Sequence, residues 1–97
     1  MEYVTGNTLW VRAGDADGYE RYDGLYEVAS YLVEMGVREP LKKCRPYGFA
    51  TRGFDEYNYI SLYWGDDREA DPVKSLTRAE LAELNRDIKN LVADLEE

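Results

Sequence analysis

The chain has 97 residues and a formal net charge of −8, from 20 acidic and 12 basic side chains, and it contains no histidine. This charge argues against direct binding to nucleic acid or to an anionic membrane, because both are polyanions. The single cysteine, Cys44, excludes an internal disulfide and is typical of a reducing compartment. We therefore expect one acidic, cytoplasmic domain over residues 1–97, with a core too small to share with a deep substrate cavity.

A β-hairpin is predicted at the N-terminus. The pair Gly6-Asn7 separates two short β-prone segments, residues 3–5 and 8–12. Such a pair is typical of a two-residue turn between antiparallel strands.

The polar, glycine-rich segment 13–20 follows as a loop. Its acids invite comparison with a calcium-binding loop, but the first and twelfth positions would then hold Ala13 and Gly24 instead of acidic ligands. We therefore expect no metal site at Asp15 and Asp17.

The next element is predicted to be a helix that Asp23 caps and that ends near Met35, before Gly36. Apolar residues recur at helical spacing and form its expected core face: Leu25, Val28, Ala29, Leu32 and Met35.

Residues 38–52 form a basic segment in an otherwise acidic chain. Its prolines, Pro40 and Pro46, predict a turn or a short helical connection that leads into a strand over residues 47–52. The basic residues of this segment are Arg38, Lys42, Lys43, Arg45 and Arg52.

Residues 57–64 alternate strictly and predict a central strand with two different faces, which ends at Gly65. We expect Ile60 and Leu62 to be buried beneath the helices, together with leucines of the last helix. The other face carries Tyr57, Tyr59 and Tyr63. Tyrosine combines apolar area with a hydroxyl, so these three side chains are expected to stay substantially exposed.

An acidic loop follows the strand, and Pro72 marks its end. Asp66 and Asp67 are adjacent but have no supporting histidine or cysteine, so we expect them to be solvated and not to bind metal.

The last helix is predicted from a capping box, Thr77-Arg78-Ala79-Glu80, flanked by Leu76 and Leu81. One apolar stripe runs along it: Leu81, Leu84, Ile88, Leu91, Val92 and Leu95. Beside the stripe lies an acidic flank that includes Glu80, Glu83, Asp87 and Asp94, whereas Arg86 and Lys89 occupy the other flank.

Together these elements predict an α+β fold, an antiparallel sheet of about four strands with two helices packed on one face. Nothing in the pattern predicts a cofactor or a catalytic group. The two features that suggest function are the acidic side chains of the last helix and of the Asp66-Asp67 loop, and the abundance of tyrosine, a residue common at interface hot spots.

Small size, acidity, a tyrosine-rich sheet face and the lack of a catalytic pattern resemble the small phage inhibitors of host defence, such as anti-CRISPR and anti-restriction proteins that mimic DNA. The resemblance implies a non-enzymatic inhibitor that binds the basic surface of a nucleic-acid-binding protein, for example a CRISPR-Cas subunit. The alternatives are an acidic assembly module that forms a homodimer through the tyrosine face and, third, a small hydrolase with paired carboxylates.

Overall fold

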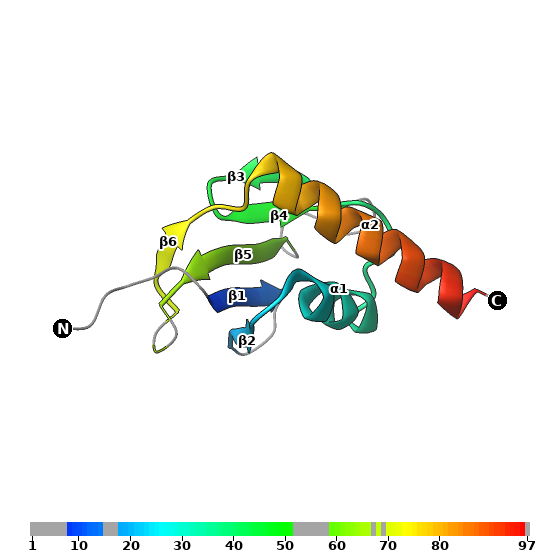
Figure 1. Ribbon diagram of the computed structural model, residues 1–97, viewed down its shortest axis with the longest axis horizontal. Coiled ribbons are helices and arrows are strands. Elements are labelled where there is room, and N and C mark those ends of the chain that lie inside the picture. Colours follow the sequence, from blue (N-terminus) through cyan, green and yellow to red (C-terminus); the bar gives the residue numbers. More distant parts are fainter. Residues whose placement is uncertain (1–7, 15–17, 52–58, 67, 69, 97) are drawn as a thin grey trace.

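The computed structural model describes residues 8–14, 18–51, 59–66, 68 and 70–96. Six strands and two helices follow one another in the order β1 (Thr8–Ala13), β2 (Glu20–Tyr22), α1 (Leu25–Glu34), β3 (Lys42–Arg45), β4 (Gly48–Ala50), β5 (Ile60–Gly65), β6 (Pro72–Lys74) and α2 (Arg78–Leu95). Figure 1 shows the strands gathered on one side of the molecule and the two helices running past their ends. The fold is therefore α+β with an antiparallel sheet, as predicted.

Strand β5 is the centre of the sheet. All of it pairs with β1 on one side, from Ile60 opposite Ala13 to Gly65 opposite Thr8. On its other side, β4 pairs with its beginning and β6 with its end. The full order is β2-β1-β5-β4-β3, with β6 attached to β5.

The sheet has six strands and not about four, because β2, β3 and β6 were not predicted. Each is only three or four residues long, and most of their side chains are exposed, so they lack an alternating apolar pattern. Strand β6 begins at Pro72, which suits a position at the edge of a sheet. Of the predicted N-terminal hairpin, β1 matches the second arm, and the first arm lies outside the described residues.

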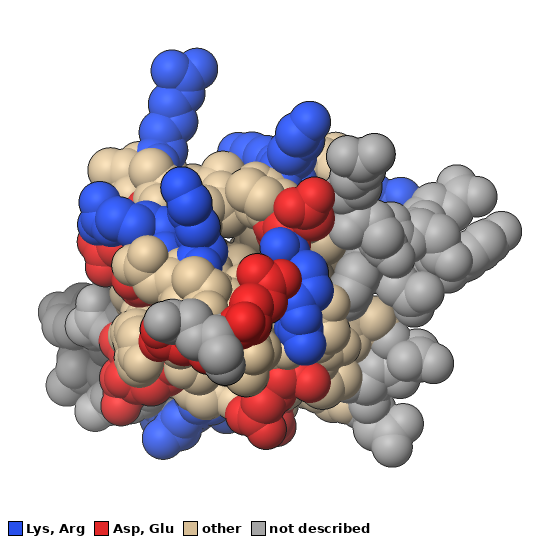
Figure 2. Space-filling model, turned by 90° about the vertical axis from the view of Figure 1, so that its right-hand side faces the viewer, with Lys and Arg blue, Asp and Glu red and all other residues tan. Residues whose placement is uncertain are grey.

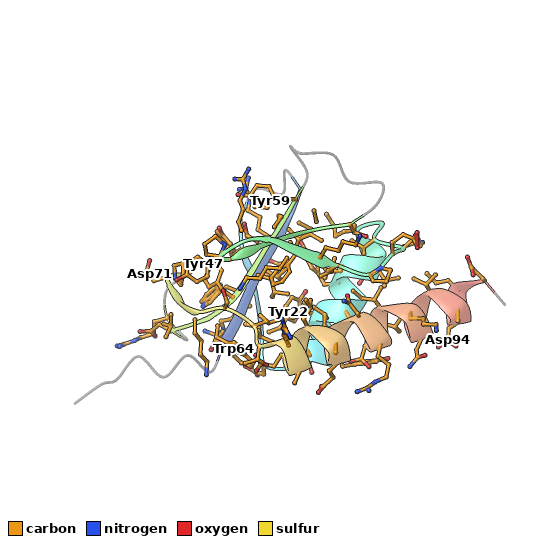
Figure 3. All side chains as sticks on the ribbon, turned by 90° about the horizontal axis from the view of Figure 1, so that it is seen from above. Tyr22, Tyr47, Tyr59, Trp64, Asp71 and Asp94 are labelled. Carbon is orange, nitrogen blue, oxygen red and sulfur yellow. The ribbon has the colours of Figure 1, made fainter. Side chains whose placement is uncertain are left out.

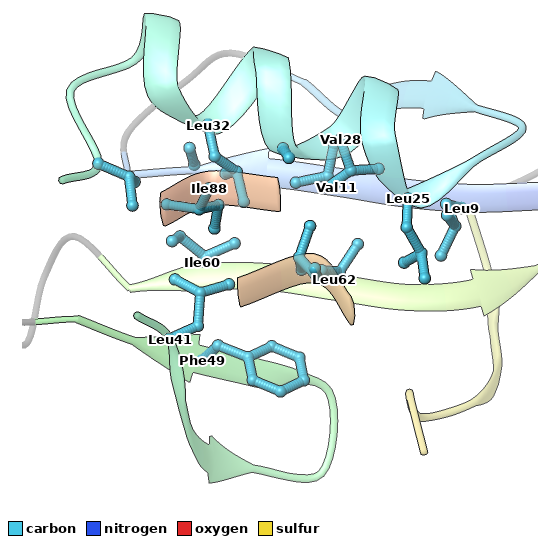
Figure 4. Close-up of a cluster of buried hydrophobic side chains, with 14 of the residues drawn as sticks. Leu9, Val11, Leu25, Val28, Leu32, Leu41, Phe49, Ile60, Leu62 and Ile88 are labelled. Carbon is cyan, nitrogen blue, oxygen red and sulfur yellow. The ribbon is translucent and has the colours of Figure 1, made fainter. Parts of the chain in front are cut away.

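The core lies between the helices and one face of the sheet, which we call the inner face. Opposed pairs on this face include Val11 with Leu62 and Ala13 with Ile60. Figure 4 shows Val11 next to Val28 of α1 and Ile60 next to Ile88 of α2. The prediction that Ile60 and Leu62 are buried with leucines of the last helix is confirmed, since they share one buried cluster with Leu84. Full burial of each such side chain contributes about 1.5–3 kcal/mol.

Helix α1 ends where predicted, with Met35 as its C-cap and Gly36 at the turn, but its N-cap and part of its core face differ from the prediction. Its N-cap is Gly24 and not Asp23, and no side chain caps the helix there. Met35, predicted in the core, is 45% exposed, and Val33 is buried instead. The cause is the turn at Gly36, whose φ of +110° ends the helix and sends Val37 back into the core.

Helix α2 begins at the predicted capping box. The Thr77 hydroxyl accepts a hydrogen bond from the Glu80 amide at 3.1 Å, and the Glu80 carboxylate accepts one from the Thr77 amide at 2.8 Å. The second oxygen of Glu80 accepts a bond from the Trp64 indole at 3.1 Å, so this carboxylate ties α2 to β5.

The basic segment is a β-hairpin of β3 and β4. The strand predicted over residues 47–52 is confirmed as β4, whereas strand β3 replaces the predicted turn or helical connection before it. Helix α2 fixes the residue that precedes β3. The Asn85 side chain accepts a hydrogen bond from the Leu41 amide at 2.8 Å and donates one to the Leu41 carbonyl at 3.1 Å. Neither helix in the described part of the chain is both long and apolar enough to span a membrane.

Candidate interaction surfaces

The outer face of the sheet, opposite the helices, carries an aromatic cluster that the sequence predicted only in part. Tyr63 is 2% exposed, so the prediction that it stays exposed is wrong. The rings of Tyr19 and Tyr47 pack edge-on against it, each with a centroid distance of 5.8 Å. The Tyr63 hydroxyl donates to the Ala70 carbonyl at 2.7 Å. Burial, and then Tyr19 and Asp71, raise the pKa of Tyr63 well above its ordinary value.

Tyr59 lies beside this cluster and is half-buried. The guanidinium of Arg45 sits 4.6 Å from its ring centroid, in the position of a cation–π contact. Gly48 makes room for the ring, because a Cβ there would lie 2.9 Å from a Tyr59 carbon. Tyr57 lies outside the described residues. Most of the predicted tyrosine surface is thus occupied by intramolecular packing, and Tyr19 and Tyr47 keep the larger exposed rings.

The acidic flank of α2 divides into two parts. Glu83 and Asp94 are exposed and Asp87 is half-buried, on one side of the helix as their spacing predicted. Glu80 belongs to the same flank, but both of its carboxylate oxygens accept hydrogen bonds from within the protein. We therefore assign Glu80 to the structure of the helix start and the other three to the surface.

In the predicted acidic loop after β5, Asp66 makes hydrogen bonds within the protein. Its backbone carbonyl accepts a bond from the Trp10 indole at 2.6 Å, and its carboxylate accepts one from the Arg68 amide at 2.9 Å. The Arg68 guanidinium also lies 3.7 Å from this carboxylate. Asp67 lies outside the described residues.

Acidic side chains of β2 and α1 enlarge the acidic surface, and the sequence prediction missed them. Glu20, Glu27 and Glu34 lie near enough to Tyr22 to raise its pKa, after burial, which is the largest cause. The Tyr22 ring packs on Tyr31 with a centroid distance of 5.8 Å. The spacing of Glu27 and Glu34, seven residues apart on one helix, was the available signal.

A shallow groove of about 420 Å³ joins these acids to α2. Glu34 lines it from α1 and Asp94 from α2, together with the apolar Val33, Leu91 and Leu95 and with the basic Arg38. We call the combined set the acidic surface, and it consists of Glu20, Glu27, Glu34, Glu83, Asp87 and Asp94.

The charges are unevenly distributed on the molecule. Figure 2 looks at the end where the helices finish, and there Lys and Arg are more frequent over the upper part and Asp and Glu over the middle and lower parts, although basic side chains also lie among the acidic ones. Figure 3 shows that Asp94 lies at the opposite end of the molecule from Tyr47, Tyr59 and Asp71. The α2 end of the acidic surface is therefore distant from the aromatic cluster.

Within the described residues, no three His, Cys, Asp or Glu side chains gather as a metal site requires. Asp15, Asp17 and Asp67 lie outside the described part of the chain, so the expectation of no metal at the two loops stays a prediction. Calorimetric titration with calcium and magnesium checks it, and stoichiometric binding at either loop would contradict it.

No protein-family model matches this chain, and no curated protein or solved structure is detectably similar to it.

Proposed function

We propose that this protein is a non-enzymatic inhibitor that offers its acidic surface to the basic, nucleic-acid-binding surface of another protein. The observation that carries the proposal is the position of Glu34, which lies near the acids of β2 and α1 around Tyr22 and lines one groove with Asp94 of α2. A partner that normally binds phosphates would meet carboxylates instead, as in the DNA mimics that the sequence resembles.

The spacing along α2 suits this role. Glu83 and Asp87 are four residues apart, or about 6 Å along the helix axis, and Asp87 and Asp94 are separated by about 10 Å. Phosphates of one DNA strand advance about 3.4 Å each, so the flank is sparser than DNA but also linear. Glu34 adds charge beside Asp94 across the groove, which makes the surface wider than one helix.

The proposed partner is a basic nucleic-acid-binding protein of a host defence complex, such as a CRISPR-Cas subunit, in the cytoplasm of the host cell. Opposite charges would steer the two proteins together, and close ion pairs would slow their dissociation. Neither nucleic acid nor membrane is expected to bind directly, because the net charge of −8 repels both.

The second candidate, an assembly module that uses the tyrosine face, keeps one supporting observation. Tyr19 and Tyr47 present exposed rings, at 37% and 39% of their area, next to each other around Tyr63. Tyr63 itself is covered, so a contact through this face would rest on those two rings.

The test has two stages. The chain is immobilised, host proteins that it retains at low salt are identified, and a purified one is then bound to fluorescent duplex DNA. The wild-type chain should displace the DNA, and the amount of DNA displaced should fall steeply as the salt concentration rises.

Three variants sharpen this displacement test. The triple change Glu83→Lys, Asp87→Lys and Asp94→Lys should abolish displacement, whereas Arg86→Glu with Lys89→Glu on the opposite flank should preserve or strengthen it. Tyr19→Ala with Tyr47→Ala should leave it unchanged. Undiminished displacement by the folded triple variant would eliminate α2 as the contact surface. Loss only in the tyrosine variant would favour the second candidate.

A further inference from the structure

The C-terminal half of α2 has an apolar surface that the rest of the domain does not cover. The helix has 18 residues and α1 has 10, and the fully buried side chains of α2 are Leu84 and Ile88. Figure 1 shows the last turns of α2 extending past the ends of the strands. Val92 is only half-buried there, and Ala93 is exposed.

This surface forms one wall of a groove of about 440 Å³. The opposite wall is the connection between α1 and β3, with Pro40 as its apolar residue and Arg38 at its edge. Arg38 is held in place, because its guanidinium donates to the Val33 carbonyl at 2.7 Å and to the Val37 carbonyl at 3.0 Å. The groove is therefore built from ordered walls, with Ile88, Val92 and Ala93 along the helix.

The two charges that α2 contributes to this groove are placed symmetrically about its apolar middle, and Arg38 and Glu39 add one charge of each sign from the opposite wall. Lys89 lies three residues before Val92, and Glu96 lies three residues after Ala93. All four share one side of α2, and the two charges are separated by about 10 Å along the axis, too far to pair within one helix. Reversing the direction of the helix about a point between Val92 and Ala93 exchanges Lys89 with Glu96.

We propose that a second copy of this chain binds in this groove, so that the two α2 helices pack antiparallel about a twofold axis between Val92 and Ala93. A twofold interface requires a surface complementary to itself, and this groove meets that condition. Val92 of one copy faces Ala93 of the other, and each Lys89 faces a Glu96. The small Ala93 side chain lets the helices approach closely.

The acidic flank of α2 points away from this groove, because Glu83, Asp87 and Asp94 lie on the other side of the helix. The dimer therefore leaves both acidic surfaces open and does not depend on the proposed inhibitory function. It also differs from assembly through the tyrosines, which lie on the outer face of the sheet.

Sedimentation equilibrium over a range of protein concentrations tests the proposal. Wild type should show a monomer–dimer equilibrium, and Lys89→Glu alone or Glu96→Lys alone should weaken it about tenfold, because two symmetry-related pairs become repulsive at once. The double variant with both changes should return to within about threefold of wild type, since the pairs are restored in reverse. Both positions are at the surface, and circular dichroism should show unchanged folding.

A cross-linking experiment tests the register without relying on charge. Ala93→Cys in a Cys44→Ser background should be joined efficiently by a short bis-maleimide, whereas Glu83→Cys in the same background should not. A wild type that stays monomeric at every concentration would overturn the proposal. So would a dimer that is indifferent to the charge changes, or one that cross-links equally well from position 83.

Discussion

The two faces of the sheet bury their central side chains by different means. On the inner face, two helices cover the aliphatic residues of β1 and β5. On the outer face, the rings of Tyr19 and Tyr47 pack against Tyr63, and its hydroxyl donates a hydrogen bond to the loop after β5. The comparison shows that a side chain can be nearly inaccessible on the face without a helical layer, when loops fold back over it.

Substitutions on the two faces should therefore destabilise the protein by different mechanisms. On the inner face, a lost side chain leaves a cavity among aliphatic groups that cannot collapse easily. On the outer face, the critical features are a close backbone approach and one hydroxyl. Four changes, in order of decreasing expected effect, can break or sharpen this contrast.

Ile88→Ala should have the largest effect, on the inner face. The side chain is 1% exposed and lies in the buried cluster with Leu32 and Ile60. Its truncation should lower the free energy of unfolding by about 2–5 kcal/mol, through lost burial and the cavity left behind. Urea denaturation measures this loss. The exposed neighbour Asn90→Ala is the matched control and should change stability by less than about 0.5 kcal/mol.

Gly65→Ala should have the next largest effect, on the outer face. A Cβ at this position would lie 2.6 Å from the Asp71 carbonyl oxygen and 2.8 Å from a carbon of Trp10. The backbone must shift to relieve this overlap, and we expect a loss of about 1–3 kcal/mol in the same denaturation experiment. Gly18→Ala is the control, since a Cβ there meets nothing within 4 Å. Equal stability of the two variants would refute the close approach.

Tyr63→Phe should cost about 1–2 kcal/mol, because the Ala70 carbonyl loses its donor while the ring packing remains. Tyr26→Phe, at an exposed position of α1, should be neutral. Thermal unfolding of the two variants distinguishes a satisfied buried hydroxyl from a merely covered ring.

The same residue should make stability depend on alkaline pH. Burial raises the pKa of Tyr63 above the value of about 10 that a tyrosine has in the unfolded chain. The folded protein therefore keeps the Tyr63 proton at pH values at which the unfolded chain has already lost it. The contribution is fully present below about pH 10 and is lost as pH rises toward the folded-state pKa. Tyr63→Phe should flatten the decline above about pH 10, and Tyr22→Phe should flatten it less. An identical decline in the Tyr63→Phe variant would contradict this assignment.

Glu80→Ala should have the smallest of these effects, about 1 kcal/mol, through loss of the capping box and of the bond to the Trp64 indole. Glu83→Ala, one turn further along the same flank, should leave the free energy of unfolding nearly unchanged. Two acids that look alike in sequence would then separate into a structural and a surface residue. Equal losses in calorimetric unfolding would show that the division of the flank is wrong.

Local patterns predicted the elements whose signals lie within a few neighbouring residues. The capping box at Thr77 and the turn at Gly36 depend on backbone groups close in sequence, and both were found. Strands β2 and β3 could not be found in this way, whereas β4 lies within the predicted strand over residues 47–52. The side chains of β2 and β3 are mostly exposed, and these segments are strands because β1 and β4 offer them hydrogen-bonding edges.

The candidate site shows the same division. Helical spacing was enough to place Glu83, Asp87 and Asp94 on one flank of α2. It could not show that Glu34 lies across a groove from Asp94, because that proximity depends on how α1 packs along α2. Nor could it distinguish Glu80 from its neighbours, because the bond from Trp64 joins residues that are 16 positions apart.

The sequence by itself determined the acidic balance, the two-faced central strand and the amphipathic last helix, because each follows from composition or from the period of one element. Only the tertiary structure decided which side of an element stays open. Tyr63 is covered by rings from two loops that are distant in sequence. Ala93 remains uncovered because α2 extends beyond the ends of α1 and of the sheet. The exposure of a side chain depends on which other segments pack over it. The periodic pattern of one segment does not show where those other segments lie.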